Sequence, residues 1–139
     1  MRQMQEIITV RTRGQGLYEF TAEAVRFVRA SGIATGLLTL YCRHTSASLS
    51  IQENADPDVQ RDLAEFYSRL AREDEPWYRH RSEGPDDMPA HIRSSLTDVS
   101  LTIPVGGGAP LLGTWQGVFL FEHRRAPHTR QVVAHLMGE

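Results

Sequence analysis

The fold class is decided by the stretch Leu37-Leu38-Thr39-Leu40-Tyr41-Cys42-Arg43-His44-Thr45-Ser46-Ala47-Ser48-Leu49-Ser50-Ile51-Gln52. Its apolar first part predicts a strand over residues 35–42, and residues 48–52 form a second, shorter strand-like segment. Only the loop around His44 separates the two. Parallel strands need a crossover of a dozen or more residues, so strands that follow one another this closely are expected to pair antiparallel.

A helix is predicted directly after these strands. The segment Asn54-Ala55-Asp56-Pro57 is typical of a helix start, with Asp56 as the N-terminal cap and Pro57 at the first helical position. An apolar stripe then follows at successive steps of three and four residues: Val59, Leu63, Phe66, Tyr67 and Leu70. We expect this face of the helix to lie on a sheet.

The rest of the chain adds elements before and after this region. Ahead of it we predict strands over residues 4–12 and 17–20 and a helix over residues 22–30, capped by Thr21 and ended by Gly32. After it we predict a long loop over residues 73–89, a short helix over residues 89–96, and strands over residues 99–105, 111–121 and 131–137. The order ββα, ββα, short helix, βββ gives an α+β class, mostly antiparallel with packed helices, in a single domain spanning residues 1–139.

Composition limits the classes of function. The chain has 139 residues, which suits one compact domain, and its formal net charge of −2 argues against a protein that binds duplex nucleic acid. The single cysteine, Cys42, excludes an intramolecular disulfide and favours a cytoplasmic protein. The N-terminus lacks the apolar core of a signal peptide, and no stretch is long enough to cross a bilayer. We therefore expect neither export nor a membrane partner.

Three histidines lie where irregular chain meets regular structure: His44, His80 and His91. Neutral imidazole is the commonest protein ligand for zinc and similar ions, and three ligands from separate segments leave a coordination position open. No shared motif fixes two of them on one element, so the alternative that each is an ordinary polar residue stays open. The aromatic residues in the loop over residues 73–89 favour a loop folded over a site.

Several phrases along the chain resemble the YjbQ-like family, whose members are also described as secondary thiamine-phosphate synthases. They are His44-Thr45-Ser46-Ala47, Glu53-Asn54-Ala55-Asp56-Pro57-Asp58-Val59, Glu83-Gly84-Pro85-Asp86-Asp87-Met88-Pro89-Ala90-His91-Ile92, Gly113-Thr114-Trp115-Gln116-Gly117 and Gln131-Val132-Val133. The resemblance implies an α+β, sandwich-like subunit that forms a homotrimer. It also implies a weak thiamine-phosphate synthase activity and a metal or anion site around the matched histidines.

The resemblance also assigns roles to residues. His44, His80 and His91 are expected to bind a divalent metal, zinc or magnesium, and to act in catalysis with Asp87 and Glu122. Of the residues expected to bind substrate, Trp115, Gln116 and Arg130 follow from the resemblance, whereas Thr45 and Ser46 lie beside His44 and Ser95 lies on the same helix face as His91. Adjacent strand residues point to opposite faces, so only one of Glu122 and His123 is expected to join the site, and the resemblance selects Glu122. Arg130 is expected to meet a phosphate, whereas Arg124 and Arg125 are expected to lie in a solvated turn.

Two classes of function follow from these assignments. The first is an enzyme that joins a pyrimidine diphosphate to a thiazole phosphate with loss of pyrophosphate, in which metal and arginine stabilise the departing anion and Trp115 or Trp77 stacks on a ring. The alternative is a trimeric metal- or small-ligand-binding protein with only incidental catalysis. The rate with the physiological substrate would separate the two.

Overall fold

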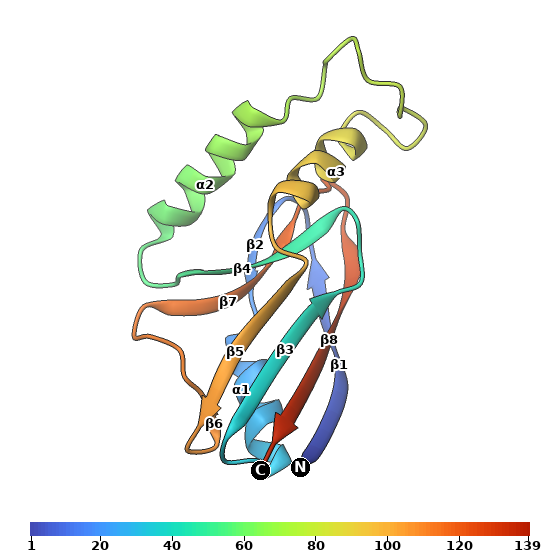
Figure 1. Ribbon diagram of the computed structural model, residues 1–139. Coiled ribbons are helices and arrows are strands. Elements are labelled where there is room, and N and C mark those ends of the chain that lie inside the picture. The colour runs from blue at the N-terminus through green and yellow to red at the C-terminus, as the bar shows by residue number, and fades with distance from the viewer.

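The computed structural model describes residues 1–139 as two antiparallel sheets and three helices (Figure 1). In chain order the elements are β1 (Arg2–Thr12), β2 (Gly16–Glu19), α1 (Thr21–Ser31), β3 (Gly36–Cys42), β4 (Ala47–Glu53), α2 (Pro57–Leu70), α3 (Asp87–Leu96), β5 (Ser100–Gly106), β6 (Ala109–Pro110), β7 (Gln116–Glu122) and β8 (His128–Gly138). This confirms the α+β class. The chain also contains a two-residue strand, β6, that the sequence did not predict, and no helix is long and apolar enough to span a membrane.

The two sheets face each other across the core. The larger has the strand order β1-β8-β3-β5-β6 and the smaller the order β2-β7-β4, and every pairing is antiparallel. The expected pairing of β3 with β4 is wrong. β3 already has β8 and β5 as neighbours, so the loop around His44 carries the chain from one sheet to the other. As a result this loop lies at one end of the sandwich, beside the ends of β7 and α3.

Helix α1 packs one face against the core and leaves the other face exposed. Ala24, Phe27 and Val28 of its buried face are at most 3% exposed. Gly32 ends the helix in the left-handed conformation with φ of 71°, as predicted. The predicted cap is wrong: Phe20 occupies the N-cap position, while the Thr21 hydroxyl donates to Glu19 and accepts from the backbone N–H of Val118.

Helix α2 begins as predicted, with the Asp56 carboxylate accepting a hydrogen bond from the Asp58 backbone N–H at 2.9 Å. The expectation for its apolar stripe holds only in part, because no residue of the helix is buried. Tyr67 makes an edge-to-face contact with Phe121 of β7 at 5.4 Å between ring centroids. The Phe66 and Leu70 side chains remain more than half exposed.

The outer face of the larger sheet is also uncovered. Side chains that alternate with the core positions on β1, β3 and β8 point away from the smaller sheet, and Ile7, Leu37, Tyr41 and Met137 are between 39% and 49% exposed. Strand register places Tyr41 and Ile7 on either side of Val133. The face therefore carries an apolar band across the neighbouring strands β1, β8 and β3.

Candidate metal centre

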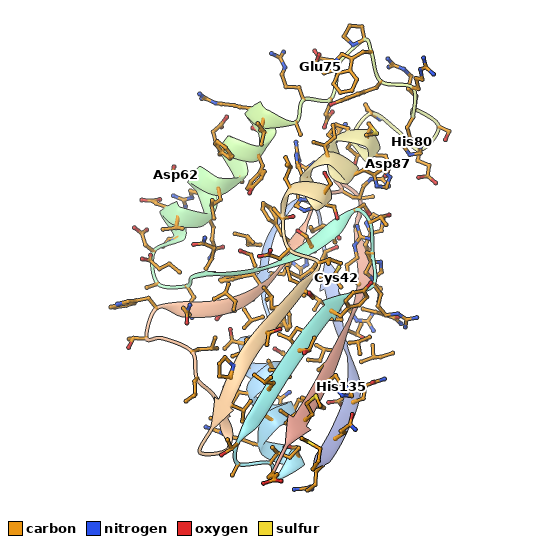
Figure 2. The ribbon with its side chains drawn as sticks, viewed as in Figure 1. Cys42, Asp62, Glu75, His80, Asp87 and His135 are labelled. Carbon is orange, nitrogen blue, oxygen red and sulfur yellow. The ribbon has the colours of Figure 1, made fainter.

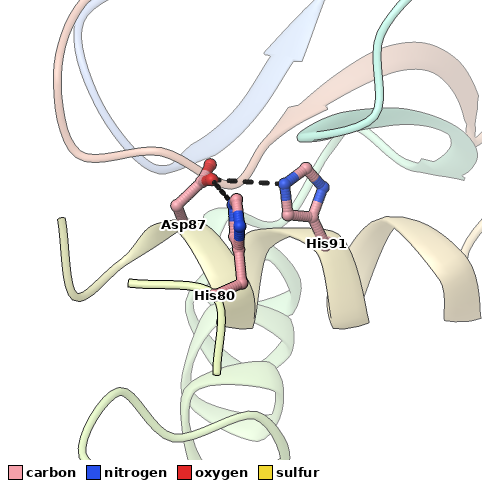
Figure 3. Close-up of side chains that lie close together, drawn as sticks. All are labelled: His80, Asp87 and His91. Carbon is pink, nitrogen blue, oxygen red and sulfur yellow. Dashed lines mark hydrogen bonds and ion pairs between the residues drawn. The ribbon is translucent and has the colours of Figure 1, made fainter. Parts of the chain in front are cut away.

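A cluster of two histidines and one aspartate lies at the end of the molecule away from the chain termini (Figures 1 and 2). His80 comes from the loop between α2 and α3, Asp87 is the first residue of α3, and His91 follows one helical turn later. The Asp87 Oδ2 atom lies 2.5 Å from His80 Nε2 and 3.2 Å from His91 Nε2 (Figure 3). The i, i+4 spacing puts Asp87 and His91 on one helix face.

The donor atoms of this cluster fit a divalent metal ion. All three lie within 4.8 Å of one another. Zinc–nitrogen and zinc–oxygen bonds of about 2.0 to 2.1 Å would set tetrahedral ligand atoms roughly 3.3 Å apart, which is close to the His91 to Asp87 separation of 3.2 Å and wider than the His80 to Asp87 separation of 2.5 Å. The Asp87 side chain is 2% exposed, against 42% for His80 and 31% for His91. The carboxylate thus forms the floor of the cluster, and the imidazoles border solvent.

The charge of Asp87 is maintained by its neighbours. Burial by itself would raise the pKa of this carboxyl group, but the hydrogen bond with His80 and the charge of Arg124 outweigh burial and hold the pKa below its usual value. Arg124 Nη1 lies 2.8 Å from Asp87 Oδ1. Asp87 is therefore an anion with one oxygen bound by a guanidinium and the other oxygen turned toward the two imidazoles.

His91 is oriented by the loop that follows β3. Its Nδ1 atom lies 2.8 Å from the carbonyl oxygen of Thr45. A carbonyl can only accept, so Nδ1 carries a proton, and Nε2 is the ring nitrogen that faces the cluster. Thr45 thus acts through its backbone, whereas its hydroxyl was expected to bind substrate.

His44 does not join the cluster. Its Nε2 accepts a hydrogen bond of 2.8 Å from the backbone N–H of Gln131, and its Nδ1 lies 3.5 Å from Arg130 Nη1. Burial, followed by the nearby charge of Arg130, lowers the pKa of His44. In this structure the predicted trio of histidines is replaced by His80, Asp87 and His91, because His44 ties the ends of β3 and β8 together.

Glu122 and Arg130 form a buried ion pair below the centre. Glu122 is fully buried and accepts five hydrogen bonds, from the Thr12 hydroxyl, Arg130 Nε and Nη2, and the backbone N–H groups of His123 and Arg124. Burial raises the pKa of Glu122, but the bonds from Arg130 and Thr12 outweigh it and lower the pKa. The oxygens of Glu122 are thus fully occupied by hydrogen-bond donors, whereas Arg130 uses Nε and Nη2 for Glu122 and Ser46 and keeps only a 3.5 Å contact from Nη1 to His44.

The other predicted substrate-binding residues fall in different places. Ser46 accepts a hydrogen bond from Arg130 Nη2 at 3.0 Å, which fixes the loop around His44. The Ser95 hydroxyl donates to the Ile92 carbonyl within α3. Trp115 and Gln116 lie at the start of β7, the end of the strand opposite Glu122, and the Gln116 amide oxygen accepts from the Gly113 backbone. Trp115 and Gln116 are therefore remote from the cluster within this chain.

The loop over residues 71–86 brings His80 to α3. Tyr78 is 6% exposed and donates from its hydroxyl to the Arg72 carbonyl, and Arg81 donates to the Tyr78 carbonyl. A cavity of about 220 Å³ borders His80 on the loop side and is lined by Glu73, Tyr78, His80, Arg81, Gly84 and Pro85. The loop thus supplies both one donor of the cluster and a hollow beside it.

Sequence reasoning missed Arg124. It was expected in a solvated turn, yet its side chain is 16% exposed and contacts both Asp86 and Asp87. The one available signal was the adjacent pair of aspartates itself, because two buried carboxylates require a cation. Nothing in the sequence indicated that the cation would come from the turn between β7 and β8.

The fold and the cluster together define a small α+β protein with two antiparallel sheets and a candidate metal centre at the start of its last helix. The chain belongs to the family described as UPF0047 protein YjbQ-like, whose model matches residues 6–139.

Similar proteins cover nearly the whole chain. A UPF0047 protein of Synechocystis sp. is 56% identical over 99% of this chain and 94% of its own. The UPF0047 protein YjbQ of Escherichia coli O157:H7 is 40% identical over 97% of this chain and 98% of its own. A YjbQ/UPF0047 family structure from Clostridium acetobutylicum has a TM-score of 0.87 at 32% identity and covers 95% of this chain and 99% of its own. A Sulfolobus solfataricus structure described as a YbjQ-like protein of unknown function shares the fold, with a TM-score of 0.90 at 23% identity and coverage of 99% of both chains.

These findings correct the predicted activity. Neither the family model nor the relatives named above carry a thiamine-phosphate synthase description, and the Sulfolobus solfataricus protein is described as of unknown function. The assignment as a thiamine-phosphate synthase is therefore wrong. In this chain Arg130 donates to Glu122, and Trp115 lies at the end of β7 away from the cluster.

Proposed function

We propose that this protein binds a divalent transition-metal ion through His80 Nε2, Asp87 Oδ2 and His91 Nε2, with a coordination position open to water and a small polar substrate. The observation that carries the proposal is the convergence of these three atoms, with the two imidazoles bordering solvent. Three protein ligands and one open position are the usual arrangement of catalytic zinc.

The ligand set also limits the metal. Two imidazoles and one carboxylate suit zinc and iron(II), whereas magnesium prefers oxygen ligands and keeps its waters. Of the two metals expected from the sequence, zinc is therefore favoured. When bound, the ion would supply Lewis-acid chemistry, polarising water or a substrate oxygen.

The protein's own residues would prepare the site for that chemistry. Asp87 contributes the negative charge that offsets the cation, and the Thr45 carbonyl fixes the ring of His91 with Nε2 facing the ion. The cavity beside His80 offers space for a small polar molecule next to the open position. We infer a metal-assisted reaction of the hydrolytic type.

The test is metal binding by purified protein prepared without chelator or nickel resin. Zinc should bind at one ion per chain, and His91→Ala should weaken binding by at least the roughly 10- to 100-fold typical of changes around a ligand. His135→Ala is the matched control, because His135 lies on the larger sheet far from the cluster (Figure 2). Equal zinc affinity in His91→Ala and the wild type would overturn the proposal.

We further propose that the protein is a cytoplasmic homotrimer. The trimer is what the family resemblance implies, and the uncovered face of the larger sheet supplies a surface for it. This face carries the apolar band of Ile7, Tyr41 and Val133, and the outward positions of β1, β3, β5 and β8 include no carboxylate. The buried lone thiol of Cys42 suits a reducing compartment.

Sedimentation would test the assembly. The wild type should sediment as a trimer, and Leu37→Glu should produce monomers because it places a charge in the sheet face. Leu111→Glu, at another exposed leucine outside this face, should leave the trimer intact. A wild-type monomer at all concentrations would contradict the assembly while leaving the metal proposal standing.

A further inference from the structure

Arg124 connects the turn after β7 to the start of α3. Its guanidinium has a separate acceptor for each nitrogen: Nη1 lies 2.8 Å from Asp87 Oδ1, Nε donates to Asp86 Oδ2 at 3.0 Å, and Nη2 donates to the Glu83 carbonyl at 2.8 Å. The backbone N–H of Arg124 donates in turn to Glu122 Oε2 at 3.1 Å. Both the backbone and the side chain of this arginine are therefore held in place.

The two carboxylate oxygens of Asp87 therefore have different partners. Oδ1 is bound by Arg124, and Oδ2 is the oxygen that faces His80 and His91. A free carboxylate can rotate about its bond to Cβ and bind an ion through either or both oxygens. A carboxylate with Oδ1 fixed by a guanidinium can offer only Oδ2 without breaking a charge-assisted hydrogen bond.

We propose that Arg124 is a positioning residue that restricts Asp87 to binding metal through one oxygen, and so keeps a coordination position open for substrate. The proposal rests on the metal centre described under the proposed function. If both oxygens of Asp87 bound the ion, the second oxygen would occupy a position that water or substrate would otherwise take. Arg124 thus determines the coordination number of the centre without contacting the ion.

Arg125 provides a matched comparison on the same turn. Its side chain is 55% exposed and pairs with Glu73 at 2.6 Å, and its only contact with Asp86 comes from the backbone N–H. Substituting Arg125 removes an arginine and an ion pair from this turn but leaves the contacts of Asp87 with its neighbours unchanged. Asp86 gives a second comparison, because Asp86→Asn weakens the Arg124 contact at the start of α3 while leaving Arg124 beside Asp87.

The experiment uses cobalt(II) as the probe in the full-length protein. Tetrahedral cobalt(II) absorbs visible light more strongly than five- or six-coordinate cobalt(II), so the spectrum reports the coordination number. We expect Arg124→Gln to bind cobalt with a clearly weaker absorption band per bound ion than the wild type. Arg125→Gln and Asp86→Asn should keep the wild-type band, and Arg124→Lys, which retains a charge but not the fixed geometry, should fall between them.

The possible outcomes separate this inference from the metal proposal. If the wild type binds no cobalt or zinc, the metal centre itself is wrong. If the wild type binds cobalt and the spectrum of Arg124→Gln is unchanged, Arg124 does not set the coordination and this inference is overturned. A spectral change of equal size in Asp86→Asn would also overturn it, because the effect would then come from the helix start. Should Arg124→Gln fail to fold, an unchanged spectrum in Arg124→Lys overturns the inference in the same way.

Discussion

The two carboxylates at this end of the molecule, Glu122 and Asp87, differ in what their neighbours leave free. Glu122 is fully buried and accepts five hydrogen bonds, two of them from its own following backbone. Asp87 is almost as buried, yet its Oδ2 faces two imidazoles that border solvent. The contrast shows that burial alone does not identify a functional carboxylate. A buried carboxylate can bind a metal or a substrate only if its neighbours leave one of its oxygens free.

The largest effect on stability should come from replacing Glu122, whose carboxylate oxygens all accept hydrogen bonds. Glu122→Gln leaves the Arg130 guanidinium buried without a counter-charge and turns an amide toward backbone donors. We expect a loss of about 3 to 5 kcal/mol in the free energy of unfolding. Urea denaturation of metal-free protein measures it.

Glu65→Gln is the control for this change, because Glu65 forms an exposed pair with Arg69 on α2. Its unfolding curve should match the wild type. A Glu122→Gln variant as stable as Glu65→Gln would show that the buried pair is not needed to hold β7 and β8 together.

The next effect should appear in metal affinity. Asp87→Asn retains the shape of the side chain but removes its charge, so zinc affinity should fall by about 100-fold. Competition with a chromophoric chelator measures the affinity. If Asp87→Asn binds zinc as tightly as the wild type, Asp87 is not a metal ligand. If folded Glu122→Gln loses zinc affinity to the same extent as Asp87→Asn, the two carboxylates do not differ in function.

The smallest effect concerns a buried histidine, His123, and the change of stability with pH. His123 is fully buried beside Ser48, and burial, with a contribution from the charge of Arg93, lowers its pKa from 6.5 to about 3. Between these two pH values the unfolded chain binds a proton that the native protein does not. The contribution of neutral His123 to the free energy of unfolding is therefore fully present above pH 6.5. It is lost as the pH falls from 6.5 toward 3, by at most about 1.4 kcal/mol per pH unit.

Thermal unfolding across this pH range tests the effect of His123. His123→Gln should flatten the acid loss of stability, whereas His135→Gln, at a more exposed position on β8, should not change it. An identical pH dependence in the wild type and His123→Gln would exclude a neutral buried imidazole as its source.

The sequence predicted the elements best where the signals are local. Asp56 and Pro57 place the start of α2, and Gly32 ends α1, because caps act within a few residues. The pairing of β3 was missed because both of its partners lie far along the chain. Strand adjacency in the sequence could not reveal that the chain changes sheets at His44.

The candidate site was predicted in part for the same reason. His80, Asp87 and His91 lie within one short stretch, and the resemblance pointed to all three. Arg124, which binds Asp87, is distant in sequence and was assigned to solvent. Glu122 and Arg130 were recognised as important but given catalytic and phosphate roles, because their mutual burial appears only when β7 and β8 are placed beside each other.

All three donors of the centre come from one short segment, residues 80–91. An ion bound there would close a loop of about a dozen residues, which costs little chain entropy. It would also clamp the loop over residues 71–86 onto α3, and that exposed loop is where a protease would otherwise cut first. Resistance of this loop to proteolysis would thus report metal occupancy.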